Sequence, residues 1–172
     1  TFEPYYDSYA ASIALAGATR RVVTLRAPSY DFDPDELRKA VNTNTKAILV
    51  NSPHNPTGKV FDMDELLLIS EICQEHDIVA ICDEVYEHLV FEGSHTPLIS
   101  FSGMRDRTIQ ISSAGKTFSF TGWKIGWVCA QPALLNTVRT AKQFLTYVNG
   151  APFQHAIASA LELPDAYFHN FL

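Results

Sequence analysis

Residues 47–86 read AILVNSPHNPTGKVFDMDELLLISEICQEHDIVAICDEVY, and this stretch decides the fold. It holds two short apolar runs, 47–50 and 78–82, of the kind that form strands covered on both faces. Between them, Asp62 and Glu65 form a capping box, and apolar residues recur behind it at helical spacing. A strand, a helix and a strand in this order predict parallel pairing through a right-handed crossover. The expected fold class is therefore α/β, a three-layer and mostly parallel sheet flanked by helices.

The same pattern continues on both sides of this unit. Further strands are expected at 21–25, 108–111 and 125–130. Helices are expected from an aromatic, extended start to about residue 16, from 34 to about 41, from 132 to about 149, and from about 152 to 163. With no repeat, linker or low-complexity tract, residues 1–172 are predicted to form one continuous domain.

The composition is that of an ordinary globular protein, with 47% apolar and 19% charged residues. The net charge is −6 and no basic cluster is present, so nucleic acid is not an expected partner. No apolar run is long enough to span a membrane and no leader opens the chain, which favours a cytoplasmic location without membrane contact. The three cysteines, Cys73, Cys82 and Cys129, are expected to be buried reduced thiols. The six histidines lack metal-ligand spacing, so no metal site is expected.

Polar residues follow three of the predicted strands at the point where each strand ends. These residues are NSPHNPTG at 51–58, DEVY at 83–86 and SSAGK at 112–116. Taken singly, each has an ordinary explanation: a turn, a helix cap or a solvated charge. Ligands of open α/β sheets, however, bind at the carboxyl ends of the strands. An amide, a carboxylate, a phenol, a hydroxyl and an amine are therefore expected to meet in one crevice.

This set of groups suits a lysine that forms a Schiff base with a carbonyl compound. When that compound is pyridoxal 5'-phosphate (PLP), the protein usually supplies an aspartate to the pyridine nitrogen. Lys116 and Asp83 would fill these two roles. Asn55 and Tyr86 would address the phenolic oxygen of PLP, while Ser113 and Lys124 would hold its phosphate.

At these residues the sequence resembles the class I aminotransferases of fold type I. The resemblance rests on the three strand-end motifs together with GWKIGW at 122–127, and it spans nearly the whole chain. It implies a PLP-binding large domain in which Tyr6 stacks on the cofactor and Asn51 lies near the substrate carboxylate. Lys124 replaces the arginine of aspartate aminotransferases, as in the branch that resembles kynurenine, glutamine and methionine aminotransferases. A lysine holds phosphate as a point charge rather than as a bidentate fork.

Within that branch, the run from Tyr86 to Gln154 is similar to actinobacterial aminotransferases assigned to N-succinyldiaminopimelate. The expected function is transfer of an amino group between an amino acid and a 2-oxo acid, with Lys116 as nucleophile and then general base. By the resemblance, the chain is the core of the large domain of a longer homodimeric enzyme. The small domain, with its carboxylate-binding arginine, lies outside these residues.

Two other functions remain open on the same residues. A PLP-dependent carbon–sulfur β-lyase would use the same site, and a non-enzymatic PLP-sensing domain of a regulator would keep the fold without the reaction. The resemblance also predicts cis peptide bonds at Glu3-Pro4 and Asn55-Pro56.

Overall fold

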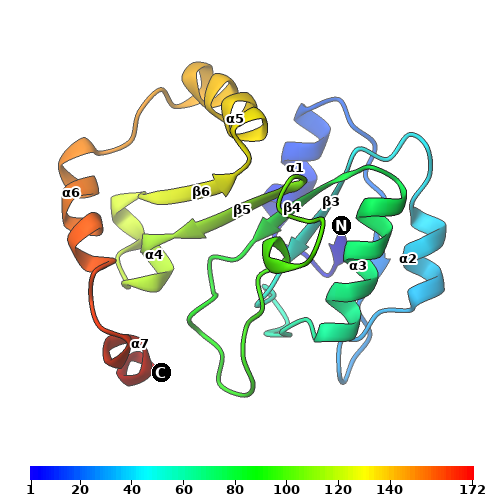
Figure 1. Ribbon diagram of the computed structural model, residues 1–172, viewed down its shortest axis with the longest axis horizontal. Coiled ribbons are helices and arrows are strands. Elements are labelled where there is room, and N and C mark those ends of the chain that lie inside the picture. The colour runs from blue at the N-terminus through cyan, green and yellow to red at the C-terminus, as the bar shows by residue number, and fades with distance from the viewer.

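A four-stranded sheet runs through the centre of the molecule in the computed structural model, which describes residues 1–172 (Figure 1). Its order is β3 (Ala47–Asn51), β4 (Val79–Asp83), β5 (Thr108–Ser113) and β6 (Gly126–Ala130). The first three strands are parallel, and β6 runs antiparallel to β5. A separate parallel pair joins β1 (Phe2–Glu3) to β2 (Val23–Thr24). The predicted mostly parallel sheet is confirmed.

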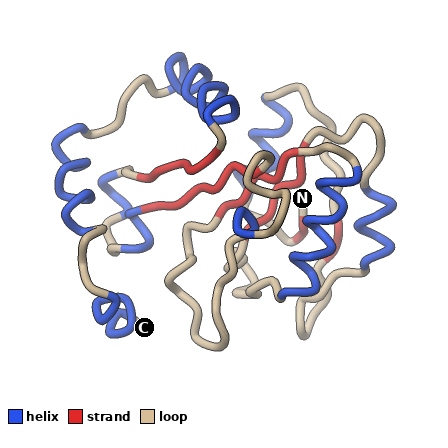
Figure 2. Tube along the Cα trace, in the orientation of Figure 1, coloured by secondary structure: helices blue, strands red, loops and turns tan.

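Helices surround this sheet (Figure 2). In chain order they are α1 (Asp7–Leu15), α2 (Pro34–Ala40), α3 (Met63–Glu75), α4 (Ala114–Thr117), α5 (Pro132–Leu145), α6 (Ala151–Ala160) and α7 (Asp165–Phe171). Short 3-10 turns, η1 (Leu98–Ser100) and η2 (Thr121–Trp123), precede β5 and β6. None of the helices is both long enough and apolar enough to cross a bilayer.

The main core lies between α3 and one face of the sheet. The capping box at the start of α3 is complete, since Asp62 Oδ1 accepts from Glu65 N at 2.9 Å and Glu65 Oε2 from Asp62 N at 3.0 Å. Ile69 and Ile72 of α3 are buried in one cluster with apolar side chains of β3 and β4. Each such side chain contributes about 1.5–3 kcal/mol on burial. This packing fixes where the ends of β3 and β4 lie relative to α3.

The opposite face and the far end of the sheet are covered more thinly. Helix α1 has one buried residue, Tyr9. A second, smaller cluster of Ala114, Phe118, Ile125 and Ile157 holds α6 against the start of β6. Helix α7, which was not predicted, packs its Phe168 ring on this cluster.

Some sequence-based boundaries differ from the structure. The strand expected at 21–25 is reduced to two residues, and α5 ends at Leu145 rather than near residue 149. The predicted cis bonds at Glu3-Pro4 and Asn55-Pro56 are confirmed, and Ala27-Pro28 and Ser52-Pro53 are cis as well.

The prediction that all three cysteines are buried holds for two of them. Cys73 and Cys82 are buried, and burial raises the pKa of the Cys73 thiol to about 12. Cys129 is exposed, so the prediction was wrong there. It lies on β6, an edge strand of the sheet, which has no fully buried residue.

Candidate active site

The carboxyl ends of β3, β4 and β5 meet at one edge of the sheet and carry the predicted site residues. Asn51, the last residue of β3, pairs in register with Asp83, the last residue of β4. Asp83 in turn pairs with Ile111 of β5, two residues before Ser113. The three strand-end motifs are therefore side by side, as the parallel order requires.

Asp83 is half-buried and receives a hydrogen bond from a residue of helix α1. The hydroxyl of Tyr9 on α1 donates to Asp83 Oδ2 at 2.5 Å. Burial, and then this hydrogen bond, raise the pKa of the Tyr9 phenol well above its usual range. The phenol therefore stays a neutral donor, and Asp83 remains available as an acceptor for a cationic ring nitrogen.

Tyr9 is a site residue that the sequence analysis missed. It follows Tyr6 by three residues, a spacing that places both rings on one face of a helix. The rings meet edge to face, with centroids 5.7 Å apart. Tyr6 is 48% exposed, so one face of its ring is open to a ligand. The second tyrosine, three residues after Tyr6, was the sequence feature from which Tyr9 could have been predicted as a site residue.

Lys116 is placed by a single turn of helix. Ser113 caps α4 by accepting from Gly115 N at 3.2 Å. Any side chain at Gly115 would collide with the backbone, because a Cβ there would lie 2.8 Å from Thr121 Cα. The Thr121 hydroxyl also donates to the Gly115 carbonyl at 3.1 Å. This close packing aims Lys116 so that its Nζ lies 5.3 Å from the centre of the Tyr86 ring.

Ser113 and Lys124 come together through the turn that joins β5 to β6. Ser113 pairs with Gly126, and Ala114 N donates to Ile125 O at 3.1 Å. Lys124 has a left-handed backbone, with φ of 55°, and its side chain is exposed. A hydroxyl, an ammonium group and the start of α4 thus lie at the same end of the hairpin.

Asn51 is held by hydrogen bonds within the chain. Its side chain is buried, and its Nδ2 donates to Asp83 O at 2.9 Å and to Pro53 O at 3.2 Å. Its Oδ1 accepts from Asn55 N at 2.7 Å. Asn51 therefore ties the 51–58 loop to β4 and orients Asn55, and its place near the substrate carboxylate stays a prediction.

His54 also has a role in the site that the sequence analysis did not assign. It is buried, its Nδ1 lies 2.7 Å from Thr57 Oγ1, and its ring lies near the carbonyl of Pro4. Burial, and then the charge of Lys59, lower the pKa of His54 to about 4. The neutral imidazole thus joins the loop that carries Asn55 to the segment that carries Tyr6.

The residues brought together fit PLP by their chemistry. Asp83 is an acceptor with a neutral partner, Lys116 is an amine beside an aromatic ring, and Tyr6 has an open ring face. Ser113 and Lys124 supply a hydroxyl and a cation, the kinds of group that bind phosphate. Gly126 allows close approach at this end, since a Cβ there would lie 2.6 Å from Ser112 O.

Residues 1–170 match the family model described as aminotransferase class I and II. A Mycobacterium tuberculosis protein described as a probable N-succinyldiaminopimelate aminotransferase is 54% identical over 96% of this chain and 42% of its own length. Human kynurenine–oxoglutarate transaminase 3 is 41% identical over 97% of this chain and 41% of its length.

Solved structures agree with the fold. The N-succinyldiaminopimelate aminotransferase of M. tuberculosis superposes with a TM-score of 0.95 at 52% identity, over 99% of this chain and 45% of that chain. YbdL of Escherichia coli, described as a methionine aminotransferase, gives a TM-score of 0.92 at 33% identity, over 97% and 44%. This chain thus spans less than half the length of the relatives it matches.

Proposed function

Because this chain belongs to the class I and II aminotransferases, we propose that it is the PLP-binding large domain of an enzyme that moves amino groups between amino acids and 2-oxo acids. The observation that carries the proposal is the arrangement of Lys116 Nζ beside the Tyr86 ring with Asp83 held by Tyr9. The named relatives are aminotransferases, which favours amino-group transfer over the carbon–sulfur lyase and the regulatory domain.

PLP, when bound, acts as an electron sink for the bonds at the α-carbon of the amino acid. Asp83 would accept a hydrogen bond from the protonated pyridine nitrogen and hold that proton in place. Tyr86 and Asn55 would donate to the phenolic oxygen, and the open face of Tyr6 would stack on the ring. Ser113 and Lys124 would bind the phosphate.

Lys116 is the residue that would act on the substrate. Its Nζ attacks a carbonyl only as a neutral amine, so a proton must leave it first. The same Nζ would be the base that takes the α-proton of the substrate and later returns it. No other amine is held against the Tyr86 ring, which makes Lys116 the single candidate for this role.

The substrate proposed is N-succinyldiaminopimelate, with glutamate as the other amino compound. The 54% identity to the M. tuberculosis relative supports it. The test compares the rates of oxo-acid formation from N-succinyldiaminopimelate and from kynurenine. A faster reaction with kynurenine would contradict this choice without touching amino-group transfer itself.

The complete protein is proposed to be a cytoplasmic homodimer. Four neighbouring residues at the end of α5 expose apolar side chains, Phe144, Leu145, Tyr147 and Val148, with exposed fractions of 60% to 86%. Contiguous apolar exposure of this kind marks a surface that is covered in the assembled protein. A second copy of the chain is the proposed cover.

The first experiment identifies the lysine that holds PLP. The complete protein is incubated with PLP and reduced with borohydride, and the modified peptide is found by mass spectrometry. We expect the adduct on Lys116, and expect it to disappear in Lys116→Ala together with amino-group transfer. Lys124→Ala is the matched control: it should weaken PLP binding but leave the adduct on Lys116. An adduct on another lysine of the wild-type protein would overturn the assignment.

A further inference from the structure

A buried carboxylate lies directly behind the site, at Glu84. Along β4, Ala80 and Cys82 are buried on the face that packs against α3, and Glu84 follows them in the same alternation. Glu84 is 2% exposed, so a charged side chain occupies the end of an otherwise apolar row. Asp83 precedes it and points to the opposite face, where Tyr9 binds it.

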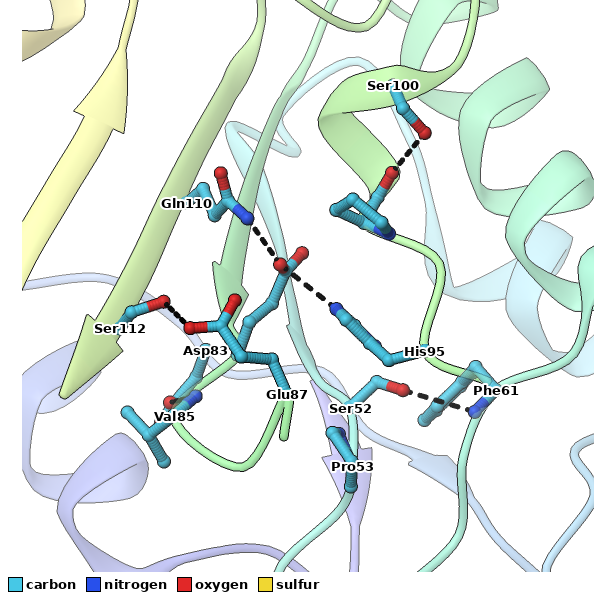
Figure 3. Close-up of polar contacts among 12 residues, drawn as sticks. Ser52, Pro53, Phe61, Asp83, Val85, Glu87, His95, Ser100, Gln110 and Ser112 are labelled. Atoms are coloured by element: carbon cyan, nitrogen blue, oxygen red, sulfur yellow. Dashed lines mark hydrogen bonds and ion pairs between the residues drawn. The ribbon is translucent and has the colours of Figure 1, made fainter. Parts of the chain in front are cut away.

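Two segments contact this carboxylate. Gln110 Nε2 of β5 lies 2.6 Å from Glu84 Oε2, and His95 Nε2 lies 3.1 Å from the same oxygen (Figure 3). His95 comes from the loop between Tyr86 and η1, and its Nε2 is buried and makes no hydrogen bond, so that the Glu84 carboxylate is the polar group it contacts. Burying a carboxylate without polar partners is strongly unfavourable, so these contacts offset a large penalty. The two contacts also bring β4, β5 and the loop that carries His95 together at Glu84 Oε2.

The residues on either side of Glu84 form the proposed active site. Glu84 N donates to Ile111 O at 2.9 Å, and its carbonyl accepts from Glu87 N at 2.9 Å. The chain therefore turns directly after Glu84, with Tyr86 inside the turn. A second tie holds the same loop, because Ser112 Oγ donates to Glu87 Oε1 at 2.7 Å. Any shift of Glu84 would move Asp83 on one side and Tyr86 on the other.

We propose that Glu84 is a positioning residue, which fixes the turn that presents Asp83 and Tyr86 by binding His95 and Gln110. A carboxylate does this where an apolar side chain would not, because its hydrogen bond with Gln110 has direction and its close contact with His95 gives that buried nitrogen a polar neighbour. The role rests on the proposed function, since it concerns the groups that would hold PLP.

The test uses the complete protein with Glu84→Gln, His95→Gln and the double variant. Amide hydrogen exchange without PLP reports on residues 84–97, and PLP titration followed by absorbance gives the Kd. Exchange in the loop should become about tenfold faster and the Kd about tenfold higher in each single variant. The double variant should be little worse than either single one, since both remove the same contact.

Ser70→Ala is the matched control. Ser70 is buried on α3 and its hydroxyl accepts from Gln74 Nε2 at 3.0 Å, away from the strand ends. This variant should lower the melting temperature and leave the loop exchange and the Kd unchanged. His95→Gln remains informative if Glu84→Gln fails to fold, because it leaves the carboxylate in place.

Three results would overturn the role. Unchanged exchange in both variants would show that the contact does not hold the loop. Faster exchange with an unchanged Kd would make Glu84 a stabilising residue only. A wild-type protein that does not bind PLP would overturn the proposed function and this role with it, whereas the first two results leave the proposed function intact.

Discussion

Tyr9 lies far from Asp83 in sequence but orients the carboxylate of this predicted site residue. Its hydroxyl donates to Asp83 across 74 positions of chain. In Tyr9→Phe we expect a loss of about 1.5–3 kcal/mol in the free energy of unfolding, as for other hydrogen bonds to charged groups, and roughly tenfold lower kcat because the carboxylate can rotate.

The control for Tyr9→Phe is Tyr30→Phe, since the Tyr30 hydroxyl makes no hydrogen bond within the chain. Urea unfolding and steady-state kinetics of the complete protein measure both quantities. Equal kcat values in the two variants would show that the Tyr9 hydroxyl does not act on the reaction.

His54 predicts how stability depends on pH. Its pKa is about 4 in the folded chain and about 6.5 when unfolded, so the unfolded state takes up a proton first as pH falls. Its contribution is fully present above pH 6.5 and is lost as pH falls to 4. Between pH 7 and pH 5 the loss is about 2 kcal/mol.

In His54→Asn this part of the pH dependence should disappear, although the variant is less stable at pH 7. Urea unfolding at pH 7 and pH 5 checks it, with the exposed His155→Asn as control. If His54→Asn loses as much stability as the wild type between these values, another group causes the acid sensitivity.

At this scale the sequence predicted those residues that stand at strand ends. Lys116, Asp83 and Tyr86 follow apolar runs, so their place at one edge of the sheet followed from the parallel order. Tyr9 and Glu84 could not be assigned in the same way. Their partners lie on other elements, and only the packing of α1 and of the 87–97 loop brings them together.

Among the elements, α3 fixes the position of β3 and β4 by packing against them. The first turn of α3 depends on the capping box. Asp62→Ala leaves the Glu65 backbone N–H without its acceptor, and we expect a loss of about 1 kcal/mol in the free energy of unfolding.

Asp64→Ala is the comparison for this change. It removes an exposed acid from the same turn, whose interaction with the helix dipole is worth only about 0.3–1 kcal/mol. Thermal unfolding of both variants distinguishes the two effects. An Asp62→Ala protein as stable as Asp64→Ala would show that the cap contributes no more than a surface charge.

Elements with strong local signals were predicted well. Helix α3 has a cap at its start and apolar residues at helical spacing, and both are present in the structure. Local signals did not decide the direction of β6 or the existence of α7. An apolar run reads the same in a parallel and an antiparallel strand, and α7 is a short helix held by the packing of Phe168 on His88 and Phe118.

For the whole molecule, the apolar end of α5 predicts self-association. Replacing Phe144 and Tyr147 by serine removes two large exposed side chains, and we expect the dimer to dissociate at least about tenfold more readily. Sedimentation of the complete protein measures this.

Phe91→Ser is the matched control, since Phe91 is 80% exposed and lies in the segment between β4 and η1, far from α5 in sequence. It should leave the dimer unchanged. If the double serine variant sediments like the wild type, the surface is covered by another part of the same polypeptide or is not an interface.

The connection between β5 and β6 carries one part of the site within a short stretch of chain. This part can form at a different stage of folding from the rest. Ser113, Lys116 and Lys124 lie within twelve residues of each other, and closing so short a loop costs little chain entropy. The Tyr9–Asp83 contact spans 74 residues and needs the crossovers of the parallel sheet to be in place. The phosphate end of the cofactor site is therefore encoded locally and can assemble early in folding, whereas the end that would receive the pyridine nitrogen is complete only when the whole domain is.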